Sequence, residues 1–315
     1  MNGLRAGAAA AYGAAWELRR TLYARGWRRP ARVAARVVSI GNLTVGGTGK
    51  TTLTLHLARM LATCGADFAV VCRRYRPGPA GAGDEELMYQ QAFGASRVYA
   101  GDVKRDLARR AAADGHAVVL VDDGFSHWQL ERDVNLVLLD AQDLWGGGRL
   151  LPAGRLREPR RALQRADAVI VSRVGPNEDP AALIAEGLRH APAAHGAAGR
   201  HRVTGVRSRA GAQPARGARV WIVTATGNPA AVERSAREAG LYVAGMSRYR
   251  DHHWFRASEL RAAHARAAAA GAMVLVTSKD AVRWPDGDAD VLVLDVAWEW
   301  IVGGTAIEAR IAAAS

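Results

Sequence analysis

The stretch from residue 36 to residue 62, RVVSIGNLTVGGTGKTTLTLHLARMLA, constrains the fold of this chain more than any other. It begins as a short β-branched, apolar run, passes through a glycine-rich turn, and continues with leucine and methionine at helical intervals. A strand that leads into a glycine-rich turn and then a helix is the local context of a phosphate-binding loop. This order of elements favours an α/β fold built on parallel strands.

The turn has the residues that a nucleotide-phosphate site needs. Glycines let backbone N–H groups surround phosphate oxygens, and the following helix adds the positive end of its dipole. Lys50 is one of only three lysines in the chain, and its flexible stem suits the β- and γ-phosphates. The strict motif has glycine where this chain has Thr44, but the core GGTGKT is intact. The predicted nucleotide-binding residues are Thr44, Val45, Gly46, Gly47, Thr48, Gly49, Lys50, Thr51 and Thr52.

A magnesium site is expected beside this turn. Thr51 offers a hydroxyl directly after Lys50, and the run AVVLVDDGF supplies Asp122 and Asp123 at its end. Because the carboxyl ends of parallel strands meet at one edge of the sheet, these groups should lie near the phosphate loop. We therefore predict Thr51, Asp122 and Asp123 as metal-binding residues, and either aspartate could contact Mg²⁺ directly.

Short apolar runs alternate with helical segments through most of the chain. The first set is RVVSI, FAVVC, AVVLVDD, VNLVLLD and DAVIVSR, and a second set is RVWIVTAT, LYVAGMS, AMVLVTS and DVLVLDV. Near-continuous apolar strands separated by helices predict a P-loop NTPase-type parallel sheet with helices on both faces. Residues 190–218 lose this rhythm, so we predict a P-loop core at 37–190, a linker or ribbon at 191–217, and a smaller α/β domain at 218–315.

Residues 1–36 form a separate amphipathic segment. Their apolar side chains gather broadly on one side of a helix, with arginines around and after them; the apolar set is Tyr12, Ala15, Trp16, Leu18, Leu22 and Tyr23. One interpretation is a helix that lies in the headgroup region of an anionic membrane. The other is a helix packed on its own domain.

The bulk composition narrows the class of protein only slightly. A net charge of +13 favours an anionic partner, which could be nucleic acid, a membrane surface or a phosphorylated substrate. No stretch reaches the roughly 18 consecutive apolar residues of a membrane-spanning helix. The two cysteines, Cys64 and Cys72, lack a disulfide framework and metal-site spacing, so we expect apolar fillers in a reducing compartment.

Seven motifs together resemble the tetraacyldisaccharide 4'-kinases, which phosphorylate the lipid A precursor in Gram-negative bacteria. Any one of them would be a weak signal, but their shared order along most of the chain is specific. They are GNLTVGGTGKT, GDEE (83–86), DDGFSHWQLERDVNLVLLDA (122–141), GGGRLLPAGRLREP (146–159), TGNP (226–229), RDHHWF (250–255) and VTSKDAV (276–282).

The resemblance implies a kinase that uses ATP and Mg²⁺. Its acceptor would be the 4'-hydroxyl of an acylated glucosamine disaccharide 1-phosphate, and its product the 1,4'-bisphosphate. It also implies peripheral attachment to the cytoplasmic face of the inner membrane, which makes an anionic membrane surface an expected partner and favours the interfacial helix. We expect a monomer and no nucleic-acid partner.

The resemblance also implies catalytic roles for Lys50, Asp84 and His252. Asp84 would be the base that receives the acceptor's proton, and His252 its partner. His253 is the alternative if the pairing is offset by one residue, and Asp251 is a candidate for orienting the ring. Glu158 in REP is a lesser candidate for the metal shell. By the predicted boundaries, Asp84 and His252 belong to different domains.

The chain departs from the family pattern at four positions. Thr52 and Glu86 stand where the family usually has proline, Ser126 replaces a glutamine, and Ser278 replaces a glutamate. The change at Ser126 removes an amide that could contact nucleotide or substrate.

Two other functions remain open at this stage. One is another P-loop small-molecule kinase or ligase with a different acceptor. The other is a nucleotide-switched DNA-binding ATPase, which is disfavoured because Val45 stands where partitioning ATPases have a second signature lysine. No nucleic-acid-binding motif is recognisable either.

Overall fold

The computed structural model describes residues 2–313 and divides into two compact units. Of the described residues, unit 1 comprises 2–73, 92–201 and 298–313, and unit 2 comprises 74–91 and 202–297. These boundaries differ from the predicted ones, and the predicted linker at 191–217 is divided between the two units. Residues 74–91 group with the second unit although they lie inside the predicted core, and residues 298–313 return to the first.

Unit 1 is built on a parallel sheet with the strand order β3-β2-β4-β1-β5-β6-β7. Apolar residues fill the central strands, which are buried along nearly their whole length. The strands are β1 (Arg36–Asn42), β2 (Phe68–Cys72), β3 (Val98–Ala100), β4 (Val118–Asp122), β5 (Val134–Asp140), β6 (Ala168–Ser172) and the first part of β7 (His195–Ser208). Residues 191–217, predicted as a linker or ribbon, thus contain the long strand β7.

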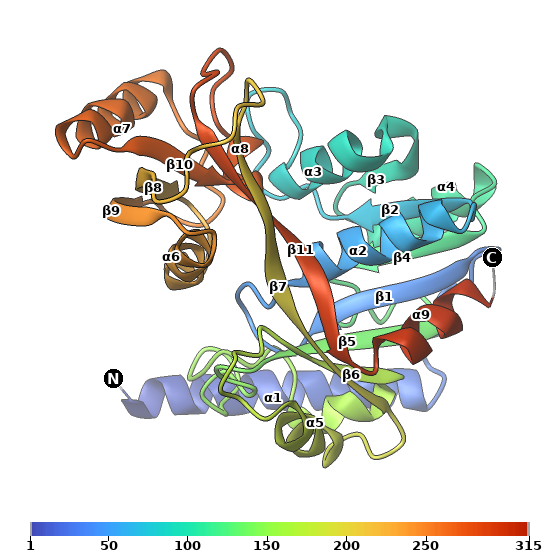
Figure 1. Cartoon of the computed structure of the whole chain (residues 1–315). Coiled ribbons are helices and arrows are strands. Elements are labelled where there is room, and N and C mark those ends of the chain that lie inside the picture. The colour runs from blue at the N-terminus through green and yellow to red at the C-terminus, as the bar shows by residue number, and fades with distance from the viewer. Residues whose placement is uncertain (1, 314–315) are drawn as a thin grey trace. The chain divides into compact units, whose positions relative to one another are not determined.

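Helices cover both faces of this sheet, which confirms the predicted α/β fold class. They are α2 (Lys50–Thr63), α4 (Lys104–Ala113), α5 (Pro180–Leu188), α9 (Gly304–Ala312) and the short 3₁₀ helices η1 (Ala95–Arg97) and η2 (Arg160–Arg165). In Figure 1, α2 runs along the central strands with α9 beside it. The ring of Trp300, near the end of β11 (Leu292–Val302), joins His56 of α2 to Glu308 of α9 by hydrogen bonds of 3.1 and 2.7 Å. This contact explains why the end of the chain groups with unit 1.

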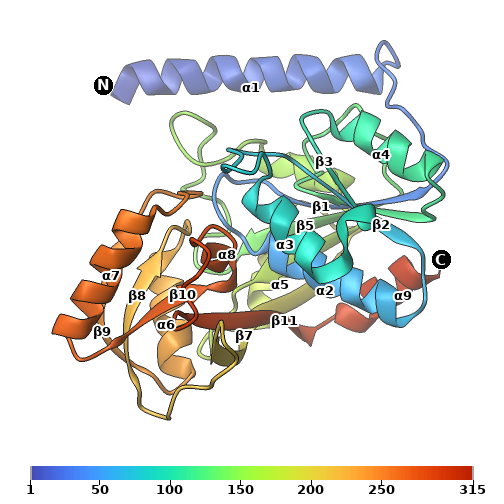
Figure 2. The same cartoon turned by 90° about the horizontal axis from the view of Figure 1, so that it is seen from above.

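Helix α1 (Asn2–Ala24) packs on unit 1 through one side and exposes the other. The ring of Trp16 meets that of Trp128 edge-on, and its Nε1 donates to Glu158 Oε2 at 2.9 Å. Leu4 and Leu18 are 87% and 62% exposed. Leu18 lies about 200° around the helix from Trp16, on the side that faces away from unit 1. The sequence analysis grouped Leu18 with Trp16 on one side of the helix, but the structure places Leu18 on the exposed side. Figure 2 shows α1 as one straight helix on the outside of unit 1.

Unit 2 has a smaller parallel sheet with the order β11-β10-β8-β9. Helices α6 and α7 cover its two faces, over clusters that include Ile222 on one side and Val223 on the other. Its elements are α3 (Asp84–Phe93, whose last two residues belong to unit 1), β8 (Arg219–Thr224), α6 (Pro229–Glu238), β9 (Tyr242–Arg248), α7 (Ala257–Ala269), β10 (Met273–Thr277), α8 (Ser278–Ala281) and the first part of β11 (Leu292–Val302).

Residues 74–91 join unit 2 through contacts that are distant in sequence. Trp254 Nε1 donates to the carbonyl of Arg76 at 2.9 Å, and a Cβ at Gly78 would lie 2.5 Å from the same indole. The guanidinium of Arg76 donates in turn to the carbonyl of Asp251 at 3.1 Å. This packing brings the start of α3 to the DHH segment.

Within residues 2–313, no helix combines the length and the apolar character needed to cross a bilayer.

Candidate active site

The glycine-rich loop between β1 and α2 is held at its entry by main-chain pairing. Val45 N donates to Arg155 O at 2.8 Å, and Arg157 N donates to Leu43 O at 2.7 Å. Thr44 lies between these bonds, is 4% exposed and forms an antiparallel bridge with Leu156. Its φ is not positive, so this position does not need the glycine of the strict motif.

The second half of the loop opens its backbone toward free space. Gly46 and Gly49 have φ of 115° and 88°, values that favour glycine. A Cβ at Gly46 or Gly47 would meet no atom within 4 Å, as expected where a phosphate approaches the backbone. Thr48 is 3% exposed, and its Oγ1 has no hydrogen-bond partner among residues 2–313. An anionic ligand in the loop would give this buried hydroxyl a partner.

Gly49 is also constrained by a residue that sequence reasoning missed. A Cβ at Gly49 would lie 2.6 Å from His201 Nε2, so the imidazole occupies the space that any larger residue would need. Burial, with a smaller effect from Arg173, lowers the pKa of His201 to about 4, so the ring is neutral at pH 7. His201 lies in β7, inside the predicted linker, and no pattern in the sequence marks it.

Lys50 begins α2 and its ammonium reaches back to the end of β1. Nζ donates to Asn42 Oδ1 at 3.1 Å and lies 3.6 Å from Asp123 Oδ1. Asn42 itself is fully buried and donates to the carbonyl of Thr44 at 2.8 Å. Thus a buried amide couples the loop to its lysine.

Asp123 directly follows β4 in an unusual backbone conformation. Its φ is 51°, in the left-handed region that costs energy for a residue other than glycine. Its carboxylate accepts two hydrogen bonds from the guanidinium of Arg157, at 2.7 and 2.8 Å. Partial burial raises the pKa of Asp123, but Lys50, Arg157 and Lys104 hold it well below its ordinary value. The site therefore keeps an ionised carboxylate between cations.

Asp122 ends β4 beside β1 and is 3% exposed. The buried ammonium of Lys104 donates to the backbone carbonyls of Asp122 and Asp123, the latter at 2.9 Å. Arg157 and Lys104 were not named from the sequence, although Arg157 lies within the motif that contains REP.

The oxygen donors at this sheet edge fit Mg²⁺ bound together with a nucleotide. Asp122 ends β4 and Asp123 follows it, while Thr51 lies in the first turn of α2, which follows the loop after the adjacent parallel strand β1. Within the described residues, no group of three or more His, Cys, Asp or Glu side chains could hold a metal. Mg²⁺ usually takes one or two carboxylates and completes its shell with phosphates and water, so a small donor set is what it needs.

Glu158 is engaged in a different role. Its carboxylate is 2% exposed and accepts from Trp16 Nε1 at 2.9 Å, from Ser126 Oγ at 2.6 Å and from the guanidinium of Arg165. Three protein donors thus surround it, and they tie α1 to the core of unit 1. We therefore do not retain Glu158 as a metal ligand.

Asp84 and His252 are hydrogen-bonded within unit 2. Asp84 begins α3 and is 2% exposed as a residue, and its Oδ2 lies 2.8 Å from His252 Nδ1. His252 has a φ of 62°, again in the left-handed region, and its backbone N–H donates to Ala225 O at 3.2 Å. The predicted boundaries had put the two residues in different domains, whereas the structure gives them to the same unit.

Two cations from α8 and the residues just after it accompany this pair. Lys279 Nζ lies 3.8 Å and Arg283 Nε 3.6 Å from Asp84 Oδ2. Burial raises the pKa of Asp84, but its hydrogen bond to His252 and these cations bring it to about 2. An ionised carboxylate only accepts hydrogen bonds, so Nδ1 of His252 carries the proton of this bond.

The alternative pairing through His253 does not form. His253 Nε2 lies 2.8 Å from Glu259 Oε2, and the ring stacks on Tyr249 with centroids 4.9 Å apart. Asp251 lies beside His252, with its Oδ2 3.7 Å from His252 Nε2.

Comparison with known proteins identifies the family. The family model described as tetraacyldisaccharide-1-P 4'-kinase matches residues 4–314. The chain belongs to this family. The predicted family and enzyme class are thereby confirmed, and the function of the family is the kinase function expected from the sequence.

Curated relatives match most of this chain in sequence, and a solved structure is similar to it in fold. The tetraacyldisaccharide 4'-kinase of Anaeromyxobacter sp. (strain Fw109-5) is 37% identical over 302 residues, which cover 89% of this chain and 79% of that protein. That of Anaeromyxobacter dehalogenans (strain 2CP-C) is 39% identical over 300 residues, covering 88% and 79%. The crystal structure of LpxK from Aquifex aeolicus in complex with ATP matches with a TM-score of 0.73 and 23% identity, over 97% of this chain and 96% of that one.

Three of the four departures from the family pattern have local partners. Ser126 donates to Glu158 at 2.6 Å, and Ser278 donates to Asp295 Oδ1 at 2.8 Å. Glu86 accepts two bonds from Arg74, at 2.7 and 2.9 Å, and one from Gly83 N at 3.1 Å. These side chains serve packing around the site. Nothing in the structure explains Thr52.

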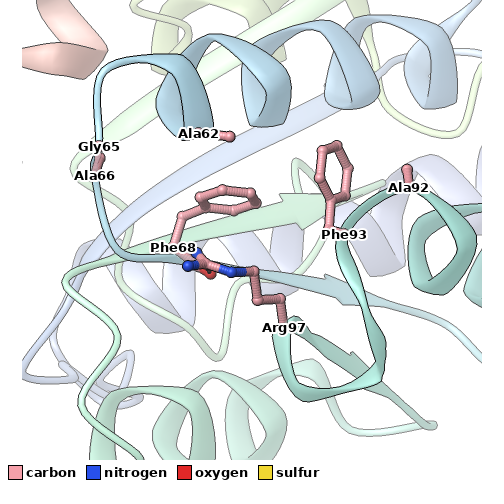
Figure 3. Close-up of a pocket in the computed structure, with 7 residues that line it drawn as sticks. All are labelled: Ala62, Gly65, Ala66, Phe68, Ala92, Phe93 and Arg97. Atoms are coloured by element: carbon pink, nitrogen blue, oxygen red, sulfur yellow. Dashed lines mark hydrogen bonds between the residues drawn. The ribbon is translucent and has the colours of Figure 1, made fainter.

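A separate cavity of about 320 Å³ lies at the opposite edge of the sheet, where β2 begins. Figure 3 shows the rings of Phe68 and Phe93 side by side above Arg97, where they meet edge-on with centroids 5.4 Å apart. The guanidinium of Arg97 already donates to Phe68 O at 3.1 Å and lies 3.3 Å from Asp67. This cavity lacks the groups for phosphoryl transfer and is not part of the candidate site.

Proposed function

We propose that this chain transfers the γ-phosphate of ATP to the 4'-hydroxyl of the tetraacyldisaccharide 1-phosphate with two sets of residues. The first set, in unit 1, binds the nucleotide. The second set, in unit 2, handles the acceptor hydroxyl. The observation that carries this proposal is the ionised Asp84, 2.8 Å from His252, in a chain that also holds a glycine-rich loop with Lys50 beside Asp123.

The loop residues Thr44 to Thr52 form the nucleotide side of the proposal. Backbone N–H groups of Gly46 to Gly49 surround the phosphates, and Lys50 places its charge at the β- and γ-phosphates. Asn42 and Asp123 hold the Lys50 ammonium near the loop at 3.1 and 3.6 Å. Because phosphoryl transfer depends mainly on positioning and charge stabilisation, this arrangement supplies what the first half of the reaction needs.

Mg²⁺ would be held by Thr51 and by Asp122 or Asp123, and when bound it would neutralise charge on the phosphate oxygens. Asp122 is the better candidate for direct contact, because both oxygens of Asp123 already accept from Arg157. Arg157 in turn keeps Asp123 oriented toward Lys50.

On the acceptor side, we assign the proton-accepting atom to His252 Nε2. Asp84 was the predicted base, but a carboxylate with a pKa of about 2 has little affinity for a proton at pH 7. Its role is then to hold the Nδ1–H tautomer and to stabilise the imidazolium that forms, as in a carboxylate–histidine pair. Lys279 and Arg283 keep Asp84 ionised and buried.

The reaction itself is tested with labelled ATP and the purified lipid acceptor in detergent. Formation of a bisphosphorylated lipid is the expected result, and its absence would refute the proposal. Substrate screening separates the alternatives: a soluble-metabolite kinase would prefer an acceptor without acyl chains, and a DNA-switched ATPase would show saturable, nucleotide-dependent DNA binding.

The roles of the pair are tested with Asp84→Asn, His252→Gln and the double variant. Each single change should lower kcat by about a hundredfold or more. The double variant should be no slower than the slower single variant, since the two residues act as a unit. Multiplicative losses would show that they act separately.

The site of action follows from the acceptor. A substrate with four acyl chains resides in a bilayer, so we propose peripheral binding at the cytoplasmic face of the inner membrane, where ATP is available. The exposed side of α1, with Leu4 and Leu18, and the arginines after it form the proposed contact with anionic lipid. We propose a monomer. Co-sedimentation with anionic vesicles, compared with neutral ones, tests the membrane contact.

A further inference from the structure

Asp280 in α8 is a fully buried carboxylate of unit 2 that the proposed catalytic steps do not use. Its Oδ1 accepts from the backbone N–H of Ala225 at 2.9 Å and from the guanidinium of Arg283 at 2.7 Å. Its Oδ2 accepts from the hydroxyls of Thr224 and Thr277 at 2.9 and 2.8 Å. Four donors therefore fix the orientation of this carboxylate, and it joins the segments that supply them.

One of these segments also holds the backbone of His252. Ala225 follows β8, and its carbonyl accepts from the backbone N–H of His252 at 3.2 Å. The guanidinium of Arg283 donates to the same carbonyl, also at 3.2 Å. His252 needs such support, because its φ of 62° lies in the left-handed region, which costs energy for a residue other than glycine. Asp280 thus fixes the residue whose carbonyl holds His252 in place.

A second link runs from Asp280 to Asp84 through Arg283. The side chain of Arg283 is fully buried, and its Nε donates to the carbonyl of Lys279 at 3.2 Å and lies 3.6 Å from Asp84 Oδ2. The same Oδ2 lies 2.8 Å from His252 Nδ1. A guanidinium at hydrogen-bond distance would compete with the imidazole for this oxygen, because charge-assisted bonds to a carboxylate are strong. By accepting from Arg283, Asp280 keeps the guanidinium near Asp84 but leaves Oδ2 to His252.

We propose that Asp280 is a positioning residue for phosphoryl transfer, which sets the distance between Arg283 and Asp84 and holds the backbone that presents His252. The inference rests on the proposed function, because it takes Asp84 and His252 to act on the acceptor hydroxyl. All the residues of this network belong to unit 2. Asp280 acts through the pair and not on the substrate.

The substitution Asp280→Asn tests this role, because the amide keeps the shape of the side chain but replaces one accepting oxygen with a donor. With labelled ATP and the lipid acceptor, kcat should fall at least about tenfold, as expected when a reacting group is misplaced. The KM for ATP should not change. A kcat equal to that of the unmodified chain would overturn the proposal.

The background of His252→Gln distinguishes positioning from a general structural defect. There Asp280→Asn should lower kcat by less than about twofold, because a positioning residue has no effect once the group that it positions is absent. Equal losses in the two backgrounds would show that Asp280 does not act through His252. If Asp280→Asn does not fold, Thr224→Val carries the same comparison, since it removes one hydrogen bond to Oδ2 and keeps the side-chain shape. Its kcat should fall about threefold in the unmodified background, within the range for one lost hydrogen bond.

Asp288→Asn is the matched control. Asp288 is also a largely buried carboxylate of unit 2, but it accepts from Trp284 Nε1 at 2.9 Å and lies 2.8 Å from His264 Nε2. Its variant should be less stable in urea and should keep the kcat of the unmodified chain. A fall in kcat as large as that of Asp280→Asn would mean that any lost carboxylate of unit 2 impairs the enzyme, which contradicts a specific role for Asp280.

A spectroscopic measurement separates this inference from the proposed function. In the full chain labelled with ¹⁵N-histidine, the Nδ1 proton of His252 is assigned by its loss in His252→Gln, and its chemical shift reports the hydrogen bond to Asp84. Asp280→Asn should shift or remove this signal, whereas Asp288→Asn should leave it in place. An unchanged signal in Asp280→Asn would overturn the inference even if the lipid is phosphorylated. A shifted signal in a chain that does not phosphorylate the lipid would support the network and refute only the proposed function.

Discussion

The neutral imidazole of His201 should make unit 1 sensitive to acid. Burial lowers its pKa from 6.5 to about 4, so the unfolded chain takes up a proton at a higher pH than the folded chain. The stability that depends on the neutral ring is therefore fully present above pH 6.5 and is lost as the pH falls toward 4. Lowering the pKa from 6.5 to about 4 adds about 3.4 kcal/mol to the free energy of unfolding. About 2 kcal/mol of this contribution is lost by pH 5.

Urea unfolding of the full chain and of His201→Gln at pH 7.5, 6.0 and 5.0 measures this effect. His127 has a similarly lowered pKa of about 4, but it is present in both proteins and cancels in the comparison. The free-energy advantage of the unmodified chain should shrink by about 2 kcal/mol between pH 7.5 and pH 5.

Leu57→Ala provides the reference for a loss of packing alone. Leu57 is fully buried in α2 and carries no titratable group, so its cost of about 2–5 kcal/mol should not depend on pH. If the difference between the unmodified chain and His201→Gln is also constant with pH, the ring titrates normally and the argument from its burial is wrong.

Other substitutions test the loop and the acceptor pair. Lys50→Ala should lower kcat at least about a hundredfold, equivalent to about 2.7 kcal/mol, in an assay with labelled ATP; a near-normal rate would remove Lys50 from its role. Asp84→Ala should lower kcat while leaving the KM for ATP nearly unchanged, because Asp84 acts on the acceptor; a large change in that KM would contradict this. Gly49→Ala should weaken ATP binding at least about tenfold in equilibrium titration, because its Cβ would lie 2.6 Å from His201 Nε2. Gly65→Ala is its matched control, since Gly65 has a positive φ of 72° but meets no atom within 4 Å.

The sequence was informative about the loop because the evidence there is local. The strand, the glycines, Lys50 and the following helix are consecutive, and their spacing alone predicts a phosphate site. The parallel α/β class followed in the same way from apolar runs alternating with helical periods. The order of seven short motifs then indicated the family, including the segments that contain Asp84 and His252.

Sequence reasoning was less successful where a role depends on which distant segments meet. Glu158 was a candidate metal ligand, but Trp16, Ser126 and Arg165 surround its carboxylate. Residues 74–91 were assigned to the kinase core, but contacts such as Trp254 with the Arg76 carbonyl draw them into unit 2.

Local order along the chain was thus enough to indicate the phosphate loop, the fold class and the family. The choice of His252 over His253, the low basicity of Asp84 and the contact of His201 with Gly49 became visible only once the chain was folded. The low basicity of Asp84 and the contact of His201 with Gly49 depend on burial and on side chains separated by more than a hundred residues. The choice of His252 over His253 depends on which of two neighbouring rings turns toward a carboxylate. Spacing along the chain does not encode those distances, because packing sets them.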